Sequence, residues 1–146
     1  MPFPMSLALL TLVALAIDQS PVEPSQRGDW IRTPSGLSYK VLVPGAGDVA
    51  AAGHSVTIHE ITSLPDGTVV YDSRARNTPV TFTLGANQVI TGVDEGVTGM
   101  RVGERRRLEV PPSLSRRTSY PPNTPKDATL CIEVELLGIR KTGGLR

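Results

Sequence analysis

The sequence predicts an α+β fold in which an antiparallel sheet of about five or six strands wraps around one short α-helix. Three observations predict it. Apolar side chains recur with a period of two along most of the chain after residue 36. Only one segment has the pattern of a helix, and the 14 glycines and 13 prolines indicate many turns. At 146 residues, the chain is one domain long and can bury a core of its own.

The strands follow from alternation between apolar and polar side chains. The clearest case is near the end of the chain, where apolar residues at 130, 132, 134 and 136 alternate with a cysteine and two glutamates. The segment 65–67 reads Pro-Asp-Gly and supplies a tight turn between two strands. The predicted strands cover residues 37–43, 55–60, 68–71, 80–84, 105–110 and 129–137.

The predicted helix lies in the segment 89–100, which reads VITGVDEGVTGM. Thr91 is expected to be its N-cap, and acidic residues follow in the first turn, where the helix dipole favours them. The internal glycines Gly96 and Gly99 lower helix propensity, so packing must hold this helix. We expect both glycines to mark a close approach to a strand.

The N-terminal segment differs from the rest of the chain. Residues 6–17 read SLALLTLVALAI, an apolar run too short to span a bilayer, which takes roughly 20 residues. Ala14-Leu15-Ala16 has the small-x-small pattern that signal peptidase reads, although no Lys or Arg precedes the run. We therefore expect residues 1–16 to be a removed export signal and the protein to be periplasmic or secreted, without stable membrane insertion. The alternative is a tether through an uncleaved anchor.

The remaining segments are divided by composition. Residues 17–34 are rich in Ser, Pro, Gln and charge and are expected to form a solvated linker. Residues 35–140 carry the strands and the helix and are expected to form the domain. Residues 141–146 are expected to be a flexible tail.

Charge and cysteine content exclude several classes of function. The formal net charge is +1, from 15 basic and 14 acidic residues, which argues against nucleic acid as a partner. The arginines at 105–107 and 116–117 are interpreted as a solvated strand face and a loop rather than a basic patch. The single Cys131 excludes an internal disulfide and, with only two histidines, no metal site is predicted.

One cluster is unusual for a strand end. In LPDGTVVYDSRARNTP, residues 64–79, an aromatic, an acid and an arginine come together as Tyr71, Asp72 and Arg76. By residues alone, this is a turn with a surface ion pair worth about 0–1 kcal/mol. The cluster lies between GLSYKVLVPGAG and VTIH before it and QVITGVDEG, RVGERRRLEVPPSL and ATLCIEVELL after it.

In these motifs the chain resembles the FKBP class of peptidyl-prolyl cis-trans isomerases, the tacrolimus-binding family, over about residues 36–139. The resemblance implies a curved antiparallel sheet over one short helix, and catalysis of rotation about X–Pro bonds. That rotation has a barrier of roughly 20 kcal/mol and needs no nucleophile, metal or cofactor. A dry apolar pocket favours the twisted amide, because its oxygen carries less charge than in the planar form.

The resemblance also implies roles for single residues. Tyr71 is the aromatic wall, Asp72 is the pocket carboxylate, and Arg76 is the arginine that orients it. The backbone of the Val-Ile pair at 89–90 borders the ligand, and the Ile90 amide donates to a substrate carbonyl. The catalytic residues expected are therefore Tyr71, Asp72 and Ile90. The expected substrate-binding residues are Glu60, Arg76, Val80, Phe82, Val89, Val93, Arg116, Tyr120 and Ile132.

Several of these positions depart from the family pattern. Glu60 stands where the family has a tyrosine, Val93 where it has the tryptophan of the pocket floor, and Arg116 where it has a loop tyrosine. Val80 and Ile132 each replace a phenylalanine, and Tyr120 lies nearby at a spacing that does not match. These departures predict a wider, more aliphatic and more charged pocket.

Glu60 is the most consequential of these departures. It shares the apolar face of its strand with Val56 and Ile58, so it is expected to be at least partly buried. A buried carboxylate must find a cation or take up a proton. Arg76 and Arg116 are the candidate partners.

Three hypotheses follow. The first is an exported, monomeric peptidyl-prolyl isomerase that acts on proline-containing segments of unfolded polypeptides. The second is a non-catalytic binding or chaperone-like module that keeps the fold and has lost the chemistry of the pocket. The third is a scaffold whose arginine-rich edge docks an acidic partner, for which strong salt dependence would be the mark.

Overall fold

The computed structural model describes residues 29–117 and 122–141. The described part holds seven strands, one α-helix and a short 3-10 helix, η2. The strands are β1 (Ile31–Arg32), β2 (Ser38–Val43), β3 (Ser55–Ser63), β4 (Val69–Asp72), β5 (Val80–Thr83), β6 (Arg105–Val110) and β7 (Leu130–Arg140). The helices are α2 (Thr91–Val97) and η2 (Pro112–Leu114).

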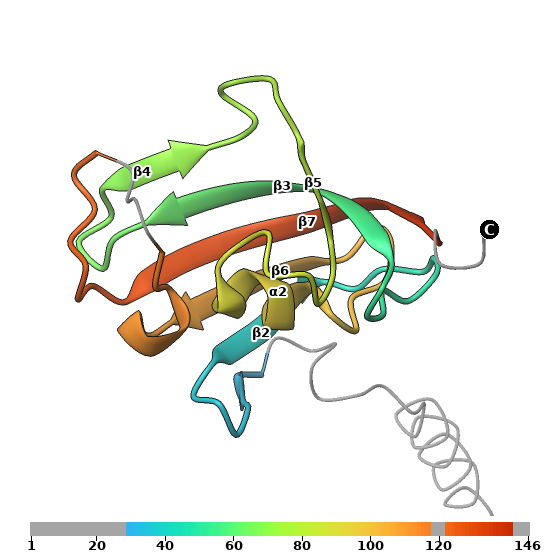
Figure 1. Cartoon of the computed structure of the whole chain (residues 1–146), viewed down its shortest axis with the longest axis horizontal. Coiled ribbons are helices and arrows are strands. Elements are labelled where there is room, and N and C mark those ends of the chain that lie inside the picture. Colours follow the sequence, from blue (N-terminus) through green and yellow to red (C-terminus); the bar gives the residue numbers. More distant parts are fainter. Residues whose placement is uncertain (1–28, 118–121, 142–146) are drawn as a thin grey trace, which may run out of the picture.

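All strand pairs are antiparallel and form one sheet in the order β1-β2-β6-β7-β3-β4, with β5 also paired to β3. The sheet curves, and α2 lies across one of its faces (Figure 1). The predicted α+β fold is therefore confirmed. The strand β1 falls inside the segment 17–34, for which the composition predicts a linker. Because Ile31 pairs with Tyr39 and Arg32 with Ser38, these two residues belong to the sheet.

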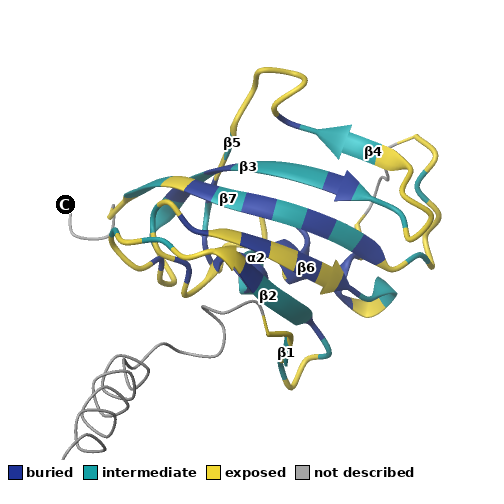
Figure 2. Ribbon diagram, turned by 180° about the vertical axis from the view of Figure 1, so that it is seen from behind, coloured by how far each residue is buried: buried dark blue, intermediate teal, exposed yellow. Residues whose placement is uncertain are grey.

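The core lies between the sheet and α2 and follows the predicted alternation. Along β7, buried and half-buried residues alternate from Leu130 to Leu136, which Figure 2 shows as stripes on that strand. From β3, Val56 and Ile58 are fully buried on the same face. The helix adds Val93 and Val97, so a small apolar face of α2 closes the core.

The helix starts one residue earlier than predicted. Ile90 is the N-cap, with an extended ψ of 150° and no side-chain cap, and Thr91 is already helical. The prediction of Thr91 as N-cap is wrong because packing of Ile90 in the core, rather than a hydroxyl cap, sets where the helix begins.

Two glycines let α2 approach β6 closely. A Cβ on Gly92 would lie 2.4 Å from Cγ1 of Val110, and one on Gly96 would lie 2.6 Å from Cδ1 of Leu108. The close approach predicted at Gly96 is thus present. A Cβ on Gly99 would meet nothing within 4 Å, and its φ of +92° shows that Gly99 serves a turn instead.

A buried arginine fixes the other end of the helix. On β6, Leu108 and Val110 point inward as predicted, and Arg106 does so as well. Its Nε donates to Glu104 at 2.5 Å, its Nη1 donates to the Gly96 carbonyl at 3.2 Å, and its guanidinium lies 4.4 Å from the Tyr39 ring centre. Arg106 therefore ties the C-terminal half of α2 to the sheet.

Candidate active site

A cavity of about 620 Å³ opens between the sheet and the start of α2. It is lined by residues from β3, β4, β5, β7 and α2, from the segment before α2 and from the segment after η2. Its apolar wall consists of Val70, Val80, Val89, Ile90, Val93, Leu130 and Ile132. The remaining lining residues are Glu60, Thr62, Tyr71, Asn87, Gln88, Arg116, Arg117 and Thr124.

The cavity opens where β3 changes partners. Its first half pairs with β5 as far as Ile58, and its second half pairs with β4 from Ile61 onward. Between them, Ser73 takes the place of a strand: its amide donates to the Glu60 carbonyl at 3.0 Å, and its Oγ accepts from the Glu60 amide at 2.9 Å. Oγ of Ser73 also hydrogen-bonds Nδ1 of His59 at 2.8 Å. This fully buried serine therefore satisfies the backbone of the residue whose side chain lines the cavity.

Glu60 brings a carboxyl group into this largely apolar wall. Burial raises the pKa of the Glu60 carboxyl, and the positive charge of Arg117 lowers it by less. Arg117 is therefore the cation that acts on Glu60, and the expectation of Arg76 or Arg116 as its partner is wrong. Arg76 is held elsewhere, and within the described residues no side chain hydrogen-bonds to this carboxyl.

Tyr71 forms one side of the cavity from β4. The guanidinium of Arg76 lies 5.1 Å from its ring centre, within the range of a cation–π contact. Arg76 itself does not line the cavity. Instead of orienting Asp72, as the family pattern implies, this arginine packs over the aromatic wall and restrains it.

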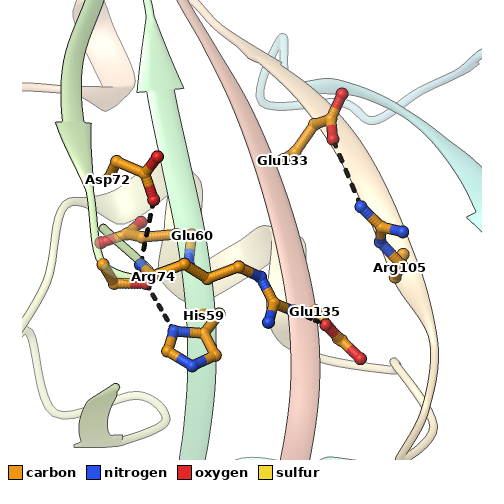
Figure 3. A network of polar contacts seen from close by, with 8 residues as sticks. His59, Glu60, Asp72, Arg74, Arg105, Glu133 and Glu135 are labelled. Carbon is orange, nitrogen blue, oxygen red and sulfur yellow. Dashed lines mark hydrogen bonds and ion pairs between the residues drawn. The ribbon is translucent and has the colours of Figure 1, made fainter. Parts of the chain in front are cut away.

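The Asp72 carboxylate is used by the turn that follows β4. Its Oδ1 accepts from the amides of Arg74 at 3.0 Å and Ala75 at 3.2 Å. The Arg74 side chain then runs across β3 to form an ion pair with Glu135 of β7, beside the Arg105–Glu133 pair (Figure 3). Asp72 therefore holds the loop between β4 and β5 and is not part of the cavity lining.

Ile90 lies at the point where the cavity meets the helix. Its carbonyl accepts from the amides of Val93 and Asp94 and so begins α2. In the described part of the chain, the Ile90 amide itself donates no hydrogen bond. It is therefore available as the donor that the family pattern implies.

The cavity brings together most of the residues predicted for it. They are Glu60, Tyr71, Val80, Val89, Ile90, Val93, Arg116 and Ile132. Three predicted residues lie outside the lining, namely Asp72, Arg76 and the buried Phe82, whose side chain belongs to the core under β5. Tyr120 lies outside the described residues.

The sequence interpretation missed other lining residues, most of which carried a signal. Thr62 and Leu130 share the faces of Glu60 and Ile132 by the period of two. Arg117 adjoins a predicted residue, and Asn87 and Gln88 directly precede the Val-Ile pair. No signal in the sequence indicated that Val70 and Thr124 would line the cavity.

Other kinds of site are not indicated by the described ranges. Residues 29–117 and 122–141 contain no group of three metal-ligating side chains placed to hold an ion. Within the same ranges, no helix has both the length and the apolar character to cross a bilayer.

The sequence and the fold of this chain are similar to those of known proteins. The family model described as FKBP-type peptidyl-prolyl cis-trans isomerase matches residues 47–137. FK506-binding protein 4 of Dictyostelium discoideum is 43% identical over 73% of this chain, which spans only 29% of that protein. FK506-binding protein 1 of the same organism is 40% identical, covering 70% of this chain and 96% of its own length.

Solved structures agree with this result. FkpA from Escherichia coli has a TM-score of 0.68 at 30% identity and covers 76% of this chain and 51% of its own. AtFKBP13 has a TM-score of 0.66 at 29% identity, over 75% of this chain and 98% of its own. The matched fold and the family model that covers most of the domain confirm the enzyme class predicted from the motifs: this chain belongs to the family of FKBP-type peptidyl-prolyl cis-trans isomerases.

Proposed function

We propose that this chain acts as a monomer and isomerises X–Pro bonds in exported, unfolded polypeptides, using the cavity between the sheet and α2. The observation that carries the proposal is the aliphatic wall of that cavity, formed by Val80, Val93 and Ile132. A proline ring is apolar and fits such a wall. Burying it there removes water from the amide whose rotation is to be accelerated.

Two further groups support catalysis. The Ile90 amide, which donates no hydrogen bond to a described residue, is placed to bind a substrate carbonyl and hold the chain on one side of the twisting bond. Tyr71, restrained by Arg76, covers the ring from the β4 side. No proton transfer is needed, because the barrier to rotation comes from the loss of amide resonance and no bond is cleaved.

The cavity is poorer in aromatic side chains than the family pattern. Tyr71 is the one aromatic residue among the described lining residues. Valine or isoleucine at positions 80, 93 and 132 covers less of a proline ring than an aromatic side chain, which buries ~150–250 Å². We therefore expect weaker substrate binding than in a cavity with a tryptophan floor.

The first test is exchange NMR on a short peptide with a neutral residue before proline, which detects isomerisation without a coupled protease. The proposal predicts that the chain accelerates cis–trans exchange and that Tyr71→Ala lowers the acceleration. Trp30→Ala is the matched control, since Trp30 is exposed and does not line the cavity. Equal loss in both variants, or no acceleration by the folded protein, would contradict the proposal.

The proposed export has its own test. The apolar run at 6–17 and the Ala14-Leu15-Ala16 pattern support cleavage after Ala16. Expression in a bacterial host, followed by mass spectrometry of the periplasmic fraction, should find a chain that begins at Ile17. An intact chain in the membrane fraction would support the uncleaved anchor instead.

A second candidate function is a binding module without turnover. Glu60 favours it, because a carboxyl group in the wall makes the cavity less dry and works against the twisted amide. In that case the peptide would bind without faster exchange. The double variant Glu60→Tyr and Val93→Trp, which restores two family residues, would then gain turnover.

A further inference from the structure

Two arginines stand at the cavity without an ion pair or a side-chain hydrogen bond among the described residues. Arg116 and Arg117 follow η2, both are exposed, and both line the cavity. Other arginines are paired: Arg74 with Glu135, Arg105 with Glu133 and Arg106 with Glu104. Across the described residues, neither Arg116 nor Arg117 forms an ion pair or a side-chain hydrogen bond.

The other charge in the cavity lining does not cancel the positive charges of Arg116 and Arg117. Apart from the two arginines and Tyr71, Glu60 is the one ionisable residue in the described lining. When it is ionised, the lining still carries a net charge of +1, and burial disfavours the ionised form. The cavity is therefore an aliphatic site next to an uncompensated positive charge.

We propose that Arg116 and Arg117 are specificity-determining residues, which favour segments with an aspartate or glutamate next to the isomerising proline. The inference rests on the proposed function and names its substrate class. Because Val93, Ile132 and both arginines line the same cavity, a side chain next to a proline bound there would meet the guanidinium groups. A carboxylate there gains charge-assisted hydrogen bonds, and a lysine is repelled.

The size of the preference follows from exposure. Because both arginines are exposed, solvent screens each contact, and a surface pair changes binding by a small factor. Together the two should raise kcat/KM for an acidic peptide over its amide counterpart by roughly three- to tenfold. The preference should weaken as salt increases, since the charges lie at the surface.

The test uses the full chain and exchange NMR on matched peptides. One series places Glu, Gln or Lys before proline, and a second places them after it. In at least one series the Glu/Gln ratio of kcat/KM should exceed three and Lys should be the poorest substrate. The ratio should fall toward one in the double variant Arg116→Gln, Arg117→Gln, and in high salt.

Two controls separate charge from structure. Arg32→Gln makes the same change at an exposed arginine outside the cavity lining and should leave the ratio unchanged. The double variant Arg116→Lys, Arg117→Lys keeps the charge and should retain most of the preference. A loss in the lysine variant as large as in the glutamine variant would overturn a role through charge.

The outcomes also separate this inference from the proposed function. A Glu/Gln ratio near one in both series, on a chain that turns over the neutral peptide, overturns the specificity and leaves the isomerase standing. If no peptide is turned over, the proposed function fails. The same ratio is then read from dissociation constants by chemical-shift titration, where equal affinities would overturn the specificity too.

Discussion

Gly92→Ala is expected to destabilise the protein by closing the gap between α2 and β6. The new Cβ would lie 2.4 Å from Cγ1, 3.0 Å from Cγ2 and 3.2 Å from Cβ of Val110. Carbon atoms pack at ~3.5–4.0 Å, so the closest contact is short by about 1 Å. Rotation of the Val110 side chain cannot relieve it, because its Cβ is among the crowded atoms and the residue is fully buried.

The expected magnitude combines two opposing effects. Overpacking a tight core costs ~1–3 kcal/mol, while alanine gains ~0.5–1 kcal/mol over glycine inside a helix. The net loss is about 1–2 kcal/mol, or a fall in Tm of roughly 5–15 °C for a domain of this size. Because the helix start must move away from β6, Ile90 and Val93 shift as well, and peptide exchange should slow at temperatures where the variant is fully folded.

The assay is thermal unfolding followed by circular dichroism, with two related variants. Gly138→Ala is the matched control, since its Cβ would meet nothing within 4 Å, and its Tm should change little. Gly96→Ala should fall between them, because its Cβ meets the branched end of Leu108, which has more freedom than Val110. A Gly92→Ala variant as stable as Gly138→Ala would refute the packing argument.

Other predictions follow from the buried charges and the cavity wall. Because burial raises the pKa of Glu60, ionisation of its carboxyl destabilises the fold as the pH rises above the ordinary pKa of 4.5. Glu60→Gln should therefore raise Tm at neutral pH and not at acidic pH. An equal gain in Tm at both pH values would contradict this. Arg106→Met should cost ~3–5 kcal/mol in urea unfolding, because Glu104 is left buried without its partner, whereas Arg105→Met at an exposed pair should cost under ~1 kcal/mol. Tacrolimus should bind weakly in a fluorescence or calorimetric titration, and Val93→Trp should tighten it; tight binding by the unchanged chain would refute the aromatic-poor cavity.

The sheet was predictable because its strands bury one face. A period of two places Leu130 to Leu136 and Val56 with Ile58 on the core side, and a slip by one residue would expose all of them. The strand β1 was not predictable, since two residues show no period and their pairing with β2 depends on the fold. The inward turn of Arg106 is also a tertiary effect, because its partners come from Glu104, α2 and Tyr39.

The cavity was predictable in part, and two of the three errors share a cause. Residues on strand faces, such as Glu60 and Ile132, were placed correctly because the alternation fixes where they point. Asp72 at the end of β4 and Arg76 in the loop after it were not, because local contacts decide their orientation. Asp72 turns to the amides of Arg74 and Ala75, and Arg76 turns to Tyr71, which no spacing in the sequence reveals.

The measurement that tests the central claim most directly is the rate of cis–trans exchange in a neutral X–Pro peptide, as the concentration of the folded chain is increased. An aliphatic cavity with the Ile90 amide at its edge predicts that the exchange rate rises in proportion to the protein and falls in Tyr71→Ala. A rate equal to that of the free peptide, in a sample where the peptide is shown to be bound, would contradict the claim.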